Sequence, residues 1–169
     1  FQAPNRLKVA LGTVPRIPPA TLFEYTDANP VMVGAAIAAA AGQPEDRYAE
    51  EHLFKPLGMR NYRWTGADQT GTVSGGWGMR LRALDMAKIG MLMLNDGKWQ
   101  GKQVVPASWI HQMSTPSSKA TAQDYGYYTW INHIVRSEPE FGAMGFKGQF
   151  ITVLPKERAV VVMTAILPT

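Results

Sequence analysis

The chain has 169 residues, of which 46% are hydrophobic and 18% are charged, and its formal net charge is +4. This length and composition are typical of one globular domain with a buried core, and they exclude a low-complexity or intrinsically disordered chain. The sequence contains no cysteine, which excludes disulfides and thiolate metal sites, and it has no apolar run long enough to span a membrane.

The first predicted element is a loop. Residues 1–21 include Pro4, Pro15, Pro18 and Pro19. Proline disfavours helix both at its own position and at the residue before it. We therefore expect residues 1–21 to follow an extended or looping path.

A buried helix is predicted over residues 30–42. Asn29 can accept a hydrogen bond from the first turn, and Pro30 has the fixed φ of a first helical position. The residues up to Ala41 carry no charge, which predicts that other elements cover this helix, and Gly42 closes it. Tyr25 lies just before the helix. Its hydroxyl either bonds a polar partner in the core or faces a cleft, and the local residues leave both alternatives open.

The middle of the chain is predicted to be mostly helical. We expect an amphipathic helix over residues 43–53, a loop over 65–78, a methionine-rich buried helix over 85–95, a strand or turn over 103–105, and a short helix over 106–113 with Trp109 and Ile110 facing inward. Residues 114–123 are polar and are expected to form a mobile connection.

The last part of the chain is predicted to form strands. Residues 125–134, 149–154 and 159–167 are rich in aromatic and β-branched residues, and the last run is apolar enough for a covered strand. A turn at residues 155–158 makes the last two strands a hairpin. The predicted fold class is therefore mixed α+β, an antiparallel sheet with the helices packed on it.

The charged residues do not predict a macromolecular partner or a metal. The basic side chains are spread among aromatic residues and glycines, so nucleic acid is not an expected partner. His52, His111 and His133 are too far apart in sequence to form a zinc motif. We expect no metal and no cofactor, and both a periplasmic and a cytoplasmic location remain open.

Several short motifs, in a fixed order, resemble the serine β-lactamase-like family, which includes penicillin-binding proteins, class C β-lactamases, family VIII esterases and amide hydrolases. They are F-E-Y-T-D-A-N-P-V-M-V-G, A-G-Q-P, F-K-P-L-G-M, G-G-W-G-M followed by L-D-M-A-K-I-G, G-K-W-Q-G-K-Q-V-V-P, and G-F-K-G-Q-F-I-T-V-L-P. Each motif alone is weak, but together they cover nearly the whole chain. The resemblance implies a β-lactamase/transpeptidase-like fold and hydrolysis of a small β-lactam, ester or amide through an acyl-enzyme.

The resemblance implies that Tyr25 is catalytic. In the family the catalytic set is Ser-x-x-Lys, then Tyr-x-Asn, then Lys-Thr-Gly or His-x-Gly. The second motif matches Tyr25-Thr26-Asp27 with one departure. Asparagine both donates and accepts hydrogen bonds whereas an ionised aspartate only accepts, so Asp27 would change how a substrate amide is recognised.

The third motif matches residues 145–149 with a second departure. Aligned on Gly148, the segment has Phe146 where the family has Lys or His, and Lys147 follows one place later. Gln149 stands where the family's backbone N–H contributes to the oxyanion hole. Strand alternation would put Phe146 and Gly148 on one face and Lys147 on the other, which favours Phe146 as the cleft residue. A glycine-bounded turn with a solvated lysine is the alternative.

The sequence contains no Ser-x-x-Lys, and Ser117-Ser118-Lys119 lacks the one-turn spacing that the motif needs. We therefore expect residues 1–169 to be a single incomplete domain, the C-terminal portion of a longer hydrolase whose missing N-terminal part supplies the serine. The alternative is a non-catalytic binding or scaffold module that has lost the chemistry. On the first hypothesis, Tyr25 and residues 145–149 should face one cleft, and the isolated chain should be inactive and expose an apolar sheet face.

Overall fold

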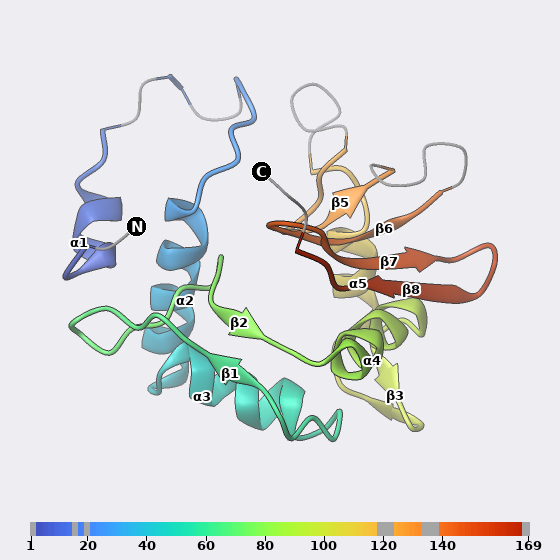
Figure 1. Cartoon of the computed structure of the whole chain (residues 1–169). Helices are drawn as coiled ribbons and strands as arrows, with labels where there is room; N and C mark the ends of the chain where they lie inside the picture. The colour runs from blue at the N-terminus through green and yellow to red at the C-terminus, as the bar shows by residue number, and fades with distance from the viewer. Residues whose placement is uncertain (1–2, 15–16, 19–20, 118–123, 133–138, 167–169) are drawn as a thin grey trace. The chain divides into compact units, whose positions relative to one another are not determined.

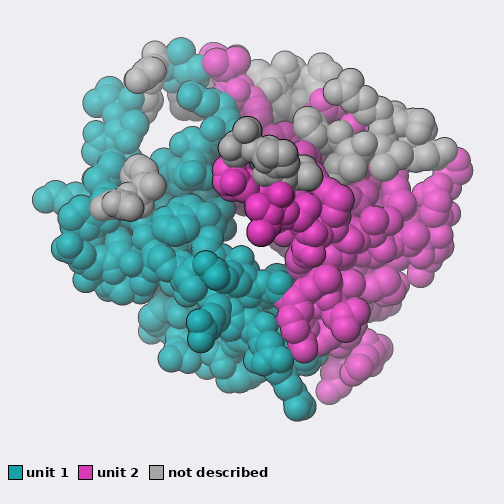
Figure 2. All heavy atoms as spheres, viewed as in Figure 1, with its two compact units in different colours: residues 1–19, 24–81 teal, residues 20–23, 82–169 magenta. Residues whose placement is uncertain are grey.

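A computed structural model describes residues 3–14, 17–18, 21–117, 124–132 and 139–166. It is a mixture of helices and antiparallel strands, which confirms the predicted α+β class (Figure 1). The chain divides into two compact units, residues 1–19 with 24–81 and residues 20–23 with 82–169 (Figure 2). No helix in the described residues is long and apolar enough to cross a membrane.

The first unit begins with a helix where a loop was expected. Helix α1 (Arg6–Leu11) starts at Asn5, whose side chain accepts a hydrogen bond from the Lys8 N–H at 2.9 Å. The prediction was wrong because the prolines flank this segment and do not interrupt it. Residues 5–14 are free of proline, and the asparagine cap satisfies one of the first unpaired N–H groups.

Helix α2 (Ala28–Ala41) begins earlier than predicted and is less covered. The Thr26 hydroxyl accepts a hydrogen bond from the Ala28 N–H, so the start lies ahead of Asn29. Gly42 ends the helix with φ 67°, as expected. The helix buries Pro30, Val31 and Gly34, but Val33 is 43% exposed. Complete burial was the wrong inference, because alanine favours helix whether or not its small side chain is covered.

The predicted amphipathic helix over residues 43–53 is confirmed. It consists of α3 (Glu45–Ala49) and one π-helical turn, η1 (Glu50–Phe54), and Gly58 with φ 62° lies in the turn that follows. Strands β1 (Arg63–Trp64) and β2 (Met79–Arg80) pair antiparallel around the predicted loop. The core of this unit is formed by Ala10, Val31, Phe54, Leu57, Met59 and Val73.

The second unit is built on a four-stranded antiparallel sheet. Its strands lie in the order β5 (Trp130–Ile131), β6 (Phe141–Gly145), β7 (Gln149–Leu154) and β8 (Ala159–Met163). The β7–β8 hairpin confirms the prediction, and its turn is closed by a hydrogen bond from the Arg158 N–H to the Pro155 carbonyl. Parts of the predicted segments 114–123 and 125–134 lie outside the described residues, as do Lys119 and His133.

Helix α4 (Ala83–Leu94) packs on β7 and β8 (Figure 1). The contact needs a glycine, because a Cβ on Gly90 would lie 2.4 Å from Val160 Cγ1. Strand β8 is less covered than predicted, since Val161 is 53% exposed. It lies at an edge of the sheet, and successive side chains of a strand point to opposite faces, so α4 covers only part of it.

The short elements between α4 and the sheet agree with the prediction except at Trp109. Strands β3 (Lys98–Trp99) and β4 (Lys102–Gln103) form a hairpin, and α5 (Ala107–Met113) follows. Ile110 is buried, but Trp109 is 45% exposed and its ring stacks on Tyr127. Neighbouring residues point in different directions on a helix, so both could not face the same core.

A buried carboxylate lies at the start of α4. Asp85 is fully buried, and its oxygens lie 2.9 Å from Arg82 Nε and 3.0 Å from Lys88 Nζ. Burial acts to raise the pKa of Asp85, but the hydrogen bonds and charges of Arg82 and Lys88 lower it overall. The Asp85 carboxylate therefore links the side chains of Arg82 and Lys88 at the start of α4.

We predict that Asp85→Asn lowers the free energy of unfolding by about 1–3 kcal/mol at pH 7, because the buried charge-assisted bonds are lost. Since the folded pKa is depressed, this contribution should be present above the ordinary aspartate pKa of 3.8 and disappear as the pH falls below it. Denaturant unfolding of both proteins measures the difference. Asp124→Asn, at an exposed position of the same unit, is the control, and equal losses for the two variants would contradict the prediction.

Candidate active site

Tyr25 lies on the approach to α2 with its side chain open to solvent. It is 52% exposed, so it is not the core tyrosine that the sequence left as an alternative. Asp27 is also exposed and occupies the N-cap position of α2, where its carboxylate accepts no hydrogen bond from the N–H groups of the first turn. Both side chains are therefore exposed in this unit.

The loop before β2 packs closely against the start of α2. A Cβ on Gly76 would lie 2.8 Å from Pro30 Cγ and 3.5 Å from Asp27 Oδ1, and a Cβ on Gly75 would lie 3.1 Å from the Pro30 carbonyl oxygen. Side chains at these positions would push the loop away. The two glycines thus place a segment of backbone beside Asp27, which is a contact that the sequence pattern did not reveal.

The β6–β7 hairpin holds the other predicted site residues, and its turn contradicts the strand alternation that was predicted for residues 146–148. Gly145 pairs with Gln149, and residues 146–148 form the turn between them. Strand alternation therefore does not apply to Phe146, Lys147 and Gly148. Phe146 is 80% exposed, Gly148 is buried, and Lys147 is partly buried with its Nζ 5.6 Å from the centroid of the Phe146 ring.

Two residues of this turn have left-handed backbone. Gly148 has φ 93°, which suits glycine, but Lys147 has φ 63°, which costs energy for a residue with a Cβ. The side chain of Gln149 donates a hydrogen bond from Nε2 to the Ala165 carbonyl. The Gln149 side chain is thus engaged within the unit.

The predicted site residues fall in different units. Tyr25 and Asp27 belong to the first unit, and Phe146, Lys147, Gly148 and Gln149 belong to the second. That they share one cleft stays a prediction. Within the described residues there is no group of three or more His, Asp or Glu side chains that could hold a metal ion.

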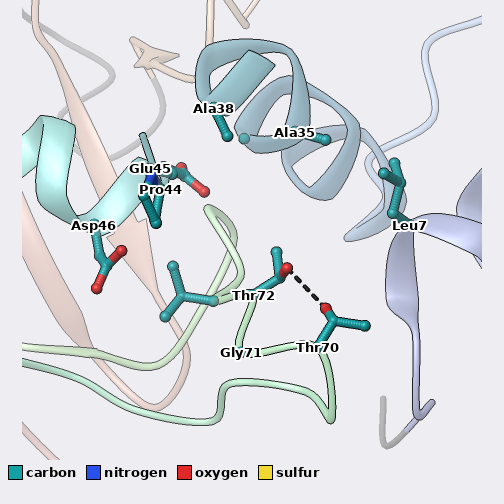
Figure 3. A pocket seen from close by; sticks show the side chains of 11 residues that line it. Leu7, Ala35, Ala38, Pro44, Glu45, Asp46, Thr70, Gly71 and Thr72 are labelled. Carbon is teal, nitrogen blue, oxygen red and sulfur yellow. Dashed lines mark hydrogen bonds between the residues drawn. The ribbon is translucent and has the colours of Figure 1, made fainter. Parts of the chain in front are cut away.

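The first unit contains a cavity that the sequence did not predict (Figure 3). It has a volume of about 320 Å³ and lies between α1, α2, the start of α3 and residues 70–73. Glu45 lines it. Burial and the nearby charge of Asp46 raise the pKa of Glu45 to about 7. In the sequence Glu45 is only an acidic residue at a helix start. The one feature that could have indicated a close contact there is Gly34, a glycine within an otherwise apolar helix.

One wall of the cavity is a loop stiffened by Asp68. Its Oδ1 accepts hydrogen bonds from the Thr70 hydroxyl and from the Thr70 and Thr72 N–H groups, and its Oδ2 accepts from the Arg6 N–H. Burial acts to raise the pKa of Asp68, but these hydrogen bonds outweigh it and lower the pKa to about 2. The buried Arg6 guanidinium donates to the Thr72 and Gly66 carbonyls and lies 4.6 Å from the centroid of the Trp77 ring.

Comparison with known proteins agrees with the sequence resemblance. The family model for β-lactamase matches residues 3–166. The 6-aminohexanoate-dimer hydrolase of Paenarthrobacter ureafaciens is 24% identical over 157 residues, which cover 86% of this chain and 40% of that protein.

Solved structures share the fold. A Bacillus anthracis protein provisionally named 6-aminohexanoate-dimer hydrolase superposes with a TM-score of 0.81 at 23% identity, over 93% of this chain and 42% of its own. A penicillin-binding protein from Bacillus halodurans gives a TM-score of 0.73 at 18% identity, over 97% of this chain and 59% of its own. The chain therefore spans roughly half the length of these relatives.

The strained backbone at position 147 gives a test of the hairpin geometry. We predict that Lys147→Gly is more stable than Lys147→Ala by about 1 kcal/mol, because only glycine adopts left-handed backbone without a steric cost. Both variants lack the contact with Phe146, so thermal unfolding of the pair isolates the backbone effect. Lys156, in the next hairpin turn and without positive φ, is the control.

At the control position, Lys156→Ala should be more stable than Lys156→Gly. An alanine variant at position 147 as stable as the glycine variant would show that the turn has a different conformation.

Proposed function

The chain belongs to the β-lactamase family, and from this membership we propose that it is the C-terminal portion of a serine hydrolase that cleaves an amide, ester or β-lactam bond through an acyl-enzyme. The observation that supports this most is Tyr25, a half-exposed phenol just before α2 at the place of the family's Tyr-x-Asn. The nucleophilic serine would come from the part of the whole protein that these residues do not include.

The proposed reaction has two steps. The serine oxygen attacks the carbonyl carbon while its proton moves toward the Tyr25 oxygen, and the tetrahedral intermediate then collapses as Tyr25 returns a proton to the leaving group. Water then attacks the acyl carbonyl carbon while its proton moves toward the Tyr25 oxygen, the bond to the serine oxygen breaks, and Tyr25 returns the proton to that oxygen as the acid is released. The Gln149 N–H would stabilise the negative charge on the carbonyl oxygen.

An amide is the favoured substrate within this class. The Paenarthrobacter relative is named for a dimer of 6-aminohexanoate, and two such units are joined by an amide bond. Asp27 is consistent with this preference, because its exposed carboxylate can accept a hydrogen bond from a substrate N–H. An ester without an N–H group would gain nothing from Asp27.

A non-catalytic binding module is the second candidate. Two departures from the family pattern favour it, Asp27 in place of asparagine and Phe146 in place of the cation. Such a module would keep an exposed Phe146 as an apolar contact for its ligand. It would bind the same class of small molecules without turnover.

We predict that Tyr25→Phe lowers kcat/KM of the whole protein by ~10²–10⁴-fold, the range expected for loss of a general acid and base. Hydrolysis of the 6-aminohexanoate dimer and of p-nitrophenyl butyrate provides the measurement. Tyr48→Phe is the matched control, because Tyr48 is exposed in the same unit and packs on His52. Full activity of Tyr25→Phe would rule out this role for the phenol.

The β6–β7 hairpin gives a second kinetic test. Phe146 is the more exposed residue and Lys147 rests on its ring, so we predict that Phe146→Ala raises KM by about tenfold through lost apolar contact with the substrate. Lys147→Ala should change kcat/KM by less than about threefold. The reverse result, a loss of ~10²-fold in kcat for Lys147→Ala, would mean that the lysine stabilises the oxyanion instead.

A further inference from the structure

The cavity of the first unit has an apolar side. Leu7 from α1, Ala35 and Ala38 from α2, and Val73 from the following loop contribute hydrocarbon surface to it. Figure 3 shows Ala35, Ala38 and Leu7 along one side of the space, with the loop that carries Thr70 and Thr72 opposite. A volume of about 320 Å³ lies at the lower end of the range of small-molecule sites. A short alkyl chain fits these walls.

The other end of the cavity carries a carboxylate. Glu45 extends from the start of α3 toward the space between α2 and the loop (Figure 3). Two glycines make room for it, because a Cβ on Gly34 would lie 2.1 Å from Glu45 Oε2 and a Cβ on Gly75 would lie 2.8 Å from Oε1. Asp46 also lines the cavity and adds a second carboxylate.

The Glu45 carboxylate has no donor within the described structure. Its Oε2 atom is buried and has no hydrogen-bond partner there. The hydroxyls of Thr70 and Thr72 bond each other at 2.9 Å, and the Arg6 guanidinium donates to backbone carbonyls. No lysine or arginine is among the residues that line the cavity. A buried acceptor without a partner is destabilised, so a donor that enters from outside would be stabilised there.

We propose that this cavity binds a short primary alkylammonium ion, with its ammonium group on the Glu45 carboxylate and its alkyl chain along Leu7, Ala35 and Ala38. An ammonium group supplies three donors and a positive charge to an end of the cavity that has two carboxylates. A carboxylate ligand would meet like charge at the same place. The site is independent of Tyr25 chemistry, so it can be tested whether or not the proposed hydrolysis is correct.

Binding should depend on pH in a defined direction. The pKa of Glu45 is raised to about 7, first by burial and then by the charge of Asp46. The other charged groups around the cavity are Asp68, which is ionised above a pKa of about 2, and Arg6 behind the loop. The ammonium ion needs the ionised form of Glu45. Affinity should therefore rise as the pH rises through 7.

The test uses n-butylammonium chloride as the probe, titrated into the whole protein at constant ionic strength and followed by saturation-transfer NMR. The probe stays protonated at pH 8.5, since its pKa is close to the value of about 10.4 for lysine. The dissociation constant should increase about 30-fold from pH 8.5 to pH 5.5, the change in the ionised fraction of a carboxyl with a pKa of about 7.

Two variants and one control complete the test. Glu45→Gln should weaken binding at pH 8.5 by at least about tenfold. Ala38→Leu, which keeps the carboxylate and fills the apolar part, should weaken it as well. Glu157→Gln removes a charge from an exposed turn of the other unit and should change nothing.

Three results would overturn the proposal. They are no binding at either pH, equal binding by the natural protein and the Glu45→Gln and Ala38→Leu variants, or preferential binding of n-pentanoate at pH 5.5. The last would show that a protonated Glu45 donates to an anion.

Discussion

The first unit depends on the close approach of three glycines to α2 and α3. Gly34 lets the Glu45 carboxylate lie against α2, Gly75 lets the loop before β2 lie against that carboxylate and the Pro30 carbonyl, and Gly76 brings the same loop beside Asp27. Any side chain at these positions would meet atoms at 2.1–2.8 Å. The start of α2 and the loop thereby pack closely within this unit, and the Glu45 carboxylate occupies the space that Gly34 and Gly75 leave.

This packing brings close together the two features of the unit to which we assign proposed functions. The stretch from Tyr25 to Asp27 leads into α2, and Gly76 touches it from the loop. Glu45 contacts the neighbouring Gly75, so the cavity and the tyrosine approach are separated by one short piece of backbone.

The sequence predicted the positions of helices and strands better than it predicted how deeply they are buried. Strand β7, the β7–β8 turn, the end of α2 at Gly42 and helix α4 follow from period, turn residues and caps, which are local properties. Burial of α2 and β8 was overestimated, because apolar composition does not say how many faces a neighbour covers. Helix α1 was not predicted, because the flanking prolines disfavour helix and the Asn5 cap is a single local signal in its favour.

In the candidate site, too, local sequence patterns predicted some features, whereas contacts between residues that are not neighbours in sequence were not predicted. Motif order predicts Tyr25 and residues 145–149 as site residues, and the structure adds that Tyr25 is exposed and that residues 146–148 form a turn. The surroundings of Glu45 could not be predicted, because they arise from contacts with Gly34 and Gly75, which are not its neighbours in sequence. Only the folded unit brings these residues together.

The measurement that tests the central proposal most directly is intact mass spectrometry of the whole protein after reaction with a slowly hydrolysed β-lactam or activated ester. An acyl-enzyme predicts one covalent adduct of the mass of the acyl group, located by peptide mapping on a serine that precedes residue 1 of this chain and is followed three residues later by lysine. Absence of an adduct, or an adduct on a residue between 1 and 169, would contradict the account.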